Sequence, residues 1–355
     1  MFIVDAHLDL AYTAVNFNRD LRQPLAAVRQ NEPNPGPRGI ATATFPELQR
    51  GGVGLIFGTL FVLPATAPIP GLTDALTYST PAEAHQQAMT QLDYYHRTAD
   101  QTGYVRLVGD LAALEEVIAS HETADTEPLL GIVPLMEGAD PIREPAEVEL
   151  WYERGLRLVG PAWDDTRYAA GAWRGRGGLT KDGEHLLQRL AEFGFIVDLT
   201  HLSEKASHQV MDRYEGPVVA THNNARALVP GERHFSDEQV RRLGQEREGM
   251  IGVVLYNRFL KAGHDKGDPK ELVTLDHVVD HIDHICQVLG NADHVGIGSD
   301  FDGGFGAADI PAEMDSAADL PLLADRLQAR GYTAVQTKAI MGGNWLTFLR
   351  RAWHR

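Results

Sequence analysis

Apolar residues gather in short continuous runs along the chain, and polar or glycine-rich residues close each run. A run that is apolar at nearly every position, without alternation, is typical of a strand buried on both faces of a parallel sheet. Parallel strands need long crossover connections, so helices are expected between them. The pattern predicts strands at Phe2–Asp9, Val53–Val62, Leu129–Glu137, Gly155–Pro161, Phe195–His201, Val218–His222, Met250–Tyr256 and His294–Asp300.

Helical periodicity lies between most of these runs, with clear examples at Glu184–Glu192, Glu204–Arg213, Asp237–Leu243 and Leu275–Leu289. Alternating strands and helices predict βαβ units with right-handed crossovers. A series of such units favours an α/β fold of the closed (β/α)8 TIM barrel type, and an open doubly wound sheet is the alternative. No linker divides the sequence, so residues 1–355 are expected to form a single catalytic domain.

Composition and charge argue against several classes of function. The formal net charge is −17 at pH 7, and such an acidic chain is not expected to bind nucleic acid or an anionic membrane, since both are polyanions. Cys286 is the only cysteine, so neither an intramolecular disulfide nor a cysteine-based zinc site can form. The sequence shows no signal peptide and no apolar stretch of membrane-spanning length, which leads us to expect a cytoplasmic location.

Histidine and acidic residues recur where the predicted strands end. The carboxyl ends of parallel barrel strands all lie on one face, where active sites are found. Residues two apart on a strand point the same way, so the first two of these side chains can both face the barrel axis. The residues are His7 and Asp9 after the first strand, Glu137 after the third, His201 after the fifth, His222 after the sixth and Asp300 after the eighth.

This set of side chains predicts a metal centre. Three imidazoles and several carboxylates around one cavity would be strongly unfavourable without cations, because like charges repel and burial removes their hydration. The ligands exceed what one catalytic zinc ion needs, so we expect two divalent ions, with zinc first and manganese or iron as alternatives. Glu137 and Asp300 are the candidate catalytic residues, Glu137 as the bridge between the ions and Asp300 as the acid/base.

A second group of histidines, His277, His281 and His284, follows helical spacing and imitates a metal cluster. The apolar residues of the same segment occupy the opposite helix face. The sequence therefore predicts that these three imidazoles point to solvent on an outer helix and hold no functional metal.

Six motifs, in order along nearly the whole chain, resemble the membrane (renal) dipeptidase family of the amidohydrolase superfamily. They are Asp5-Ala-His-Leu-Asp9, Met136-Glu-Gly138, Asp198-Leu-Thr-His-Leu-Ser203, Thr221-His-Asn-Asn-Ala-Arg226, Gly296-Ile-Gly-Ser-Asp-Phe-Asp-Gly303 and Met341-Gly-Gly-Asn-Trp-Leu346.

The resemblance implies a binuclear zinc dipeptidase. It implies one ion held by His7, Asp9 and Glu137 and another held by Glu137, His201 and His222, with Asp300 as the acid/base. By the same resemblance, Arg233 would receive the dipeptide carboxylate, for which a bidentate arginine is the right chemistry, and Tyr256 would contact the substrate. The sequence leaves the oligomeric state open, a homodimer included.

One position departs from the family pattern. The family has a histidine just past the fourth strand that supports the substrate carbonyl, and Trp163 stands there in this chain. An indole offers one N–H donor and no charge, and removing such a donor costs on the order of 10²–10³ in rate. Trp163 therefore favours an alternative, a related amidohydrolase that acts on another small amide or a lactone, such as an N-acyl amino acid. A non-catalytic metal-containing binding protein is the alternative from another class.

Overall fold

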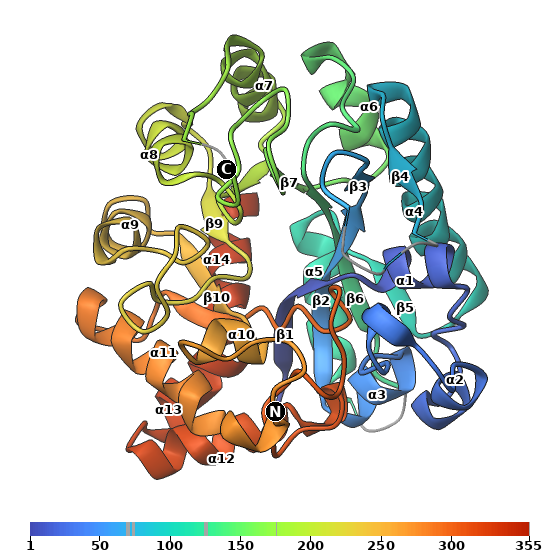
Figure 1. The fold of residues 1–355 in the computed structure, drawn as a ribbon, viewed down its shortest axis with the longest axis vertical. Helices are drawn as coiled ribbons and strands as arrows, with labels where there is room; N and C mark the ends of the chain where they lie inside the picture. Colours follow the sequence, from blue (N-terminus) through green and yellow to red (C-terminus); the bar gives the residue numbers. More distant parts are fainter. Residues whose placement is uncertain (69–71, 73–74, 124–126, 175, 355) are drawn as a thin grey trace.

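Parallel strands in the computed structural model close into a barrel, and helices surround it (Figure 1). The structure describes residues 1–68, 72, 75–123, 127–174 and 176–354. The barrel is closed because β1 pairs with both β2 and β11, while β2 also pairs with β6. Its strands, in order around the barrel, are β1 (Ile3–Leu8), β2 (Val53–Phe61), β6 (Leu130–Glu137), β7 (Leu158–Gly160), β8 (Ile196–Asp198), β9 (Val218–Ala220), β10 (Met250–Val253) and β11 (Val295–Ile297).

The (β/α)8 TIM barrel predicted from the sequence is confirmed, and the open doubly wound sheet is wrong. Every residue of β1, β2 and β6 is buried, which is why these segments are apolar almost throughout. The expectation that residues 1–355 form one domain stays a prediction. Within the described part of the chain, no helix combines the length and apolarity that crossing a membrane requires.

Helices follow most strands and cover the outside of the barrel (Figure 1). Helices α8 and α11 begin and end at the predicted residues, whereas α9 is shorter than predicted and continues as a π-helical turn. The helices are α1 (Leu10–Phe17), α2 (Leu25–Asn31), α3 (Phe45–Arg50), α4 (Pro81–Gln101), α5 (Leu111–Ser120), α6 (Val148–Glu153), α7 (Lys181–Glu192), α8 (Glu204–Arg213), α9 (Asp237–Arg241), α10 (Asn257–Leu260), α11 (Leu275–Leu289), α12 (Pro321–Arg330), α13 (Ala334–Lys338) and α14 (Asn344–Trp353).

Three short strands fall outside the prediction. Strand β5 (Val105–Leu107) pairs with the first half of β6, and β7 pairs with the second half. Strands β3 (Leu63–Pro64) and β4 (Thr77–Tyr78) form a small separate pair. Their runs of two or three residues are too short to give a periodic signal.

The last helix, α14, packs its apolar face on the barrel strands. The indole of Trp345 meets the ring of Phe57 edge to face, with 5.1 Å between ring centroids, and donates to the carbonyl of Ile297 at 3.1 Å. Gly296 permits this approach, because a Cβ at that position would lie 2.4 Å from the Trp345 indole nitrogen. The C-terminal helix is thus part of the barrel core.

The prediction that all three histidines of α11 face solvent is wrong for His281. Its side chain is fully buried, its Nδ1 accepts from the backbone N–H of Ala225 at 3.1 Å, and its Nε2 donates to the carbonyl of Leu260 at 3.2 Å. Burial lowers the pKa of His281 to about 4. The imidazole therefore serves as a neutral bridge from α11 to the loop that follows β9 and to the end of helix α10.

We expect His281→Leu to lower the free energy of unfolding by about 2–4 kcal/mol, because a buried N–H and a buried carbonyl would each lose their partner. Urea unfolding measures this change. His284→Leu is the matched control on the same helix, since its partly exposed imidazole forms an ion pair with Asp237, and it should cost less than about 1 kcal/mol. Equal effects of the two variants would contradict the bridging role.

Candidate metal centre and substrate pocket

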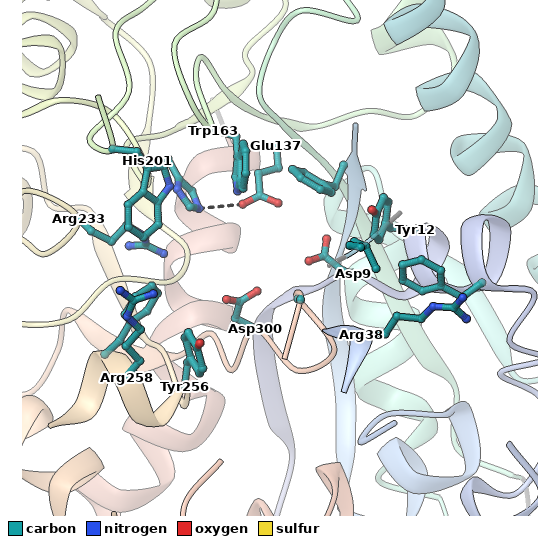
Figure 2. A pocket seen from close by; sticks show the side chains of 17 residues that line it. Asp9, Tyr12, Arg38, Glu137, Trp163, His201, Arg233, Tyr256, Arg258 and Asp300 are labelled. Carbon is teal, nitrogen blue, oxygen red and sulfur yellow. Dashed lines mark ion pairs between the residues drawn. The ribbon is translucent and has the colours of Figure 1, made fainter. Parts of the chain in front are cut away.

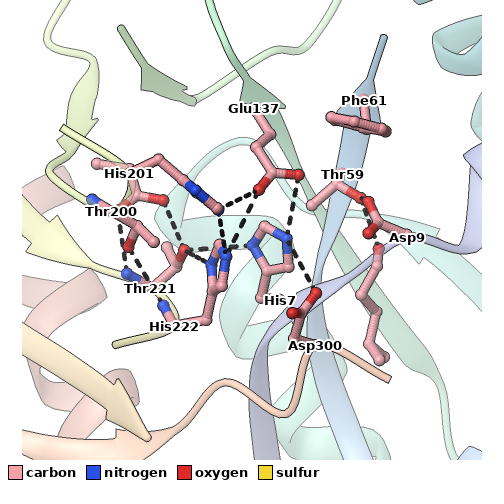
Figure 3. Close-up of polar contacts among 12 residues, drawn as sticks. His7, Asp9, Thr59, Phe61, Glu137, Thr200, His201, Thr221, His222 and Asp300 are labelled. Carbon is pink, nitrogen blue, oxygen red and sulfur yellow. Dashed lines mark hydrogen bonds and ion pairs between the residues drawn. The ribbon is translucent and has the colours of Figure 1, made fainter. Parts of the chain in front are cut away.

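The carboxyl ends of the barrel strands bring all six candidate residues to one buried cluster (Figure 3). His7 lies in β1 and Asp9 just after it, and Glu137 is the last residue of β6. The remaining three lie two or three residues past the ends of their strands, namely His201 after β8, His222 after β9 and Asp300 after β11. Their side chains are at most about one-tenth exposed.

Glu137 lies at the centre of the cluster. Its Oε2 is 3.4 Å from Nε2 of His7, while its Oε1 is 2.9 Å from Nε2 of His201 and 3.5 Å from Nε2 of His222. The two carboxylate oxygens thus face different imidazoles, which is the arrangement that a bridging carboxylate requires.

The donor atoms form three overlapping groups that could each hold a cation, with the atoms of each group within 4.8 Å of one another. The first group joins His7, Asp9 and Glu137, and the second joins Glu137, His201 and His222. These are the two sets that the family resemblance implies. The third group joins His7, His222 and Asp300, so Asp300 lies at the edge of the same centre.

The electrostatics of the cluster are unfavourable without cations. Burial and the nearby Glu137 carboxylate raise the pKa of Asp9 to about 7. Burial and the carboxylates of Asp9 and Glu137 also hold the pKa of Asp300 well above its usual value, although His7 opposes this. Burial alone would raise the pKa of Glu137, but His7 and His201 favour its charged form and lower this pKa below its usual value. The carboxylates therefore cannot all ionise freely unless positive charge is added.

The imidazoles show the same need. The Nε2 of His7, which faces Glu137, is buried and makes no hydrogen bond within the described part of the chain. Nε2 of His201 lies 2.9 Å from Nε2 of His222, so at least one of the two nitrogens directs a lone pair toward the cluster. The mixed nitrogen and oxygen donors suit zinc or a similar divalent ion, and the residues present fit a metal centre.

Two of these residues adopt a backbone conformation that is rare outside glycine. The φ angles of His201 and Asp300 are 68° and 62°, in the left-handed region. Such conformations cost energy and are concentrated at functional sites. Here the sharp backbone turn after β8 and β11 directs each side chain back over the mouth of the barrel.

A pocket opens above the cluster (Figure 2) and has a volume of about 770 Å³, solvent included. Arg233, Trp163 and Tyr256, which were expected to contact the substrate, all line it. The lining also includes residues that the sequence analysis did not single out, namely Tyr12, Phe17, Arg38, Phe61, Leu72, Arg258 and Phe259.

Position along the chain could have identified some of these lining residues. Phe61 is the last residue of β2, and Tyr12 lies three residues after Asp9 in the loop and helix that follow β1. The rule that strand ends face the site therefore applied to them too. Because both are aromatic, the sequence alone does not separate them from core residues.

Arg233 is buried, and among the described residues only one of its three guanidinium nitrogens has a hydrogen-bond partner. One nitrogen, Nη2, donates to the carbonyl of His222 at 3.0 Å, and the guanidinium lies 5.0 Å over the ring of Phe259. Its Nε and Nη1 have no hydrogen-bond partner among the residues that the structure describes. Burial lowers the pKa of Arg233 to about 10, opposed by the charges of Asp300 and Glu137. A buried cation with free donors is a receptor for an anionic group.

Trp163 forms part of the pocket wall beside Glu137 and His201 (Figure 2). Its ring meets Phe61 edge to face at 5.0 Å between centroids and lies 6.1 Å from the ring of His201. Phe61 in turn contacts Tyr12 at 5.0 Å. Trp163 is therefore anchored in an aromatic wall next to the candidate metal ligands.

Comparisons with known proteins agree with this geometry. Residues 1–354 match the family model described as membrane dipeptidase, peptidase family M19. The chain is 32% identical over 246 residues to an uncharacterized protein of Klebsiella pneumoniae, covering 67% of this chain and 88% of that protein. It is 27% identical to an uncharacterized dipeptidase of Schizosaccharomyces pombe, covering 97% and 79%.

Among solved structures, the chain resembles a metallopeptidase of Rhodobacter sphaeroides that was crystallised with a phosphinate mimic of the dipeptide L-Ala-D-Ala. The TM-score is 0.81, the sequence identity is 26%, and the match covers 99% of each chain.

Proposed function

We propose, from the premise that this chain belongs to the membrane dipeptidase family, peptidase family M19, that it is a binuclear zinc hydrolase that cleaves the peptide bond of dipeptides. The family consists of metallodipeptidases, so the chain is an enzyme of that type. The observation that carries the proposal is the position of Glu137, whose two carboxylate oxygens each face a different set of imidazole donors. This supports the count of two ions.

In this proposal, His7, Asp9 and Glu137 hold one ion, and Glu137, His201 and His222 hold the other. When bound, divalent ions supply Lewis-acid chemistry. They would polarise a carbonyl and lower the pKa of water, so that hydroxide is available to attack that carbonyl. The side chains around the ions are fixed by further contacts. The hydroxyl of Thr59 bonds to the Asp9 carboxylate, and the backbone N–H of His7 donates to Asp5 at 3.3 Å.

Arg233 is proposed to bind the C-terminal carboxylate of the dipeptide. Its Nε and Nη1 have no hydrogen-bond partner among the described residues, and one of them together with the second N–H of Nη2 can present two parallel donors to the two oxygens of a carboxylate. Tyr256, stacked on Phe305 at 4.3 Å between centroids, lies on the same side of the pocket (Figure 2). Binding the carboxylate there would place the scissile bond beside the metal ligands and Asp300.

Asp300 is proposed as the general acid/base. Its Oδ1 lies 3.9 Å from Nε2 of His7, within the cluster. Burial and neighbouring carboxylates raise its pKa, and positive charge bound beside it would favour the ionised form that accepts a proton. Such a group can accept a proton from the attacking water and deliver it to the leaving amine.

The experiment that tests this function is a hydrolysis screen of the full-length protein after metal removal and return. We expect zinc to restore cleavage of dipeptides and the chelated protein to be inactive. Restored cleavage of N-acyl amino acids or lactones alone would favour the related amidohydrolase. Zinc binding without hydrolysis of any of these substrates would instead support a non-catalytic metal-containing protein.

Trp163 is the observation that favours the second candidate function, a related amidohydrolase acting on another small amide or a lactone. We expect Trp163→His to raise kcat/KM for dipeptides by about 10-fold or more over Trp163→Phe, because an imidazole N–H can support the substrate carbonyl and a phenyl ring cannot. Steady-state kinetics on the three proteins measures this. Equal kcat/KM values for the two variants would mean that a donor at this position does not assist dipeptide cleavage.

A further inference from the structure

The hydroxyl of Thr221 lies between a buried carboxylate and two candidate metal ligands (Figure 3). Its Oγ1 is 2.5 Å from Oδ2 of Asp198, 3.3 Å from Nδ1 of His7 and 3.0 Å from Nδ1 of His222. Thr221 is fully buried, and Asp198 is nearly so. One oxygen atom therefore contacts all three side chains away from solvent.

The direction of each hydrogen bond follows from the number of hydrogens available. An ionised carboxylate can only accept, and a hydroxyl has one hydrogen to donate and two lone pairs to accept with. The backbone N–H groups of Thr200 and Thr221 both donate to Oδ1 of Asp198 at 3.0 Å, so this carboxylate acts as an acceptor in both contacts. The Thr221 hydroxyl must then donate to Asp198, so both imidazoles must donate to Thr221 through Nδ1–H.

We infer that Thr221 is a shared positioning residue that fixes His7 and His222 with the hydrogen on Nδ1, leaving Nε2 of each ring to bind metal. The inference rests on the proposed function. His7 belongs to the first proposed ligand set and His222 to the second, so a single hydroxyl orients ligands of both ions. The Nε2 atoms of both rings face the candidate metal centre, at 3.4 and 3.5 Å from the two oxygens of Glu137.

The backbone around Thr221 holds the hydroxyl in place. The carbonyl of Thr221 packs closely against Gly252 of β10 and against Gly298, which lies just after β11. A Cβ at Gly252 would lie 1.9 Å from that carbonyl oxygen, and one at Gly298 would lie 1.8 Å from it. Neither neighbour can carry a side chain without moving Thr221. This close approach explains two glycines of the sheet and limits how far the hydroxyl can shift.

His201 differs from the other two imidazoles. Its Nδ1 is buried and has no hydrogen-bond partner among the described residues. Nothing comparable to Thr221 therefore sets its orientation, and its ring instead lies about 6 Å from Trp163 and Trp173 on the pocket wall. The effect of removing the Thr221 hydroxyl should fall on His7 and His222 and leave His201 unchanged.

Imidazole N–H signals of the metal-free protein, labelled with ring-¹⁵N histidine, test the inference directly. We expect two N–H protons attached to Nδ1, from His7 and His222, to exchange slowly with solvent in the wild type. Both should disappear in Thr221→Val and persist in Thr221→Ser, which keeps the hydroxyl. Thr200→Val is the matched control, because the Thr200 hydroxyl is buried and accepts from the backbone N–H of His222 at 3.3 Å, not from an imidazole.

Competition with a chromophoric chelator gives the second measurement. Loss of such a contact behind a metal ligand lowers metal affinity by roughly 10- to 100-fold, and we expect Thr221→Val to show this for both zinc ions. Thr221→Ser and Thr200→Val should stay within about threefold of the wild type.

Three results would overturn the inference: a wild-type ring of His7 or His222 whose only hydrogen is on Nε2, survival of both signals in Thr221→Val, or weakened binding of a single ion. If Thr221→Val does not fold, the wild-type spectrum still decides the point. A wild type that binds no zinc would end the proposed function, whereas its imidazole signals would still report on Thr221.

Discussion

Asp300→Asn is expected to lower kcat/KM for dipeptides by about 10²–10⁴-fold, the usual contribution of a general acid/base, while zinc stays bound. The substitution keeps the size of the side chain and removes its ability to carry a proton. Because the proposed metal sets omit Asp300, the metal content should remain that of the wild type. Steady-state kinetics together with metal analysis of the purified variant measures both effects.

Asp302→Asn is the matched control for this experiment, since it changes a buried carboxylate two residues away in the same loop. Asp302 lies 3.4 Å from Arg19 and accepts from the backbone N–H of Thr42 at 2.8 Å, so its loss should affect stability more than turnover. If Asp300→Asn kept more than about a tenth of wild-type activity, the acid/base role would be wrong. If it lost zinc instead, Asp300 would be a ligand, as its place in the third donor group allows.

Arg233→Met is expected to lower kcat/KM for dipeptides by roughly 30-fold or more, because losing one partner of a buried charged pair costs about 2–5 kcal/mol. This loss should occur only with substrates that carry a C-terminal carboxylate. Wild-type enzyme should therefore prefer a dipeptide to the same dipeptide with a C-terminal carboxamide, and the variant should discriminate little between them. Kinetics on both substrates with both proteins measures the coupling.

Arg258→Met provides the control, because Arg258 also lines the pocket but is exposed and forms a 3.5 Å ion pair with Asp265. Exposed pairs contribute about 1 kcal/mol or less, so this variant should stay within roughly fivefold of the wild type. If Arg233→Met preferred the dipeptide over its carboxamide as strongly as the wild type does, the carboxylate would bind elsewhere in the pocket.

The barrel could be predicted because its strands are buried on both faces, which makes their sequences apolar throughout. Strand β5 gave no such signal, since Arg106 is exposed in a strand of three residues. His281 was misjudged for a related reason. Helical spacing shows that a residue lies off the main apolar stripe, but it does not show that the loop after β9 and helix α10 cover that position and bury the imidazole.

The candidate metal ligands could be predicted because each stands at a strand end, and the fold brings those ends together. Other features depend on the three-dimensional arrangement. The contact of Thr221 with both His7 and His222 joins β9 to β1 across 214 residues of sequence, and no local pattern reveals it. The left-handed φ angles of His201 and Asp300 are equally invisible in a sequence, since these residue types adopt other conformations more often.

The most direct test of the central claim is the number and position of bound ions. Crystals of the protein grown with zinc, measured at the zinc absorption edge, should show two anomalous peaks on either side of Glu137, one beside His7 and Asp9 and the other beside His201 and His222. A single peak, or none at saturating zinc, would contradict the two-metal centre.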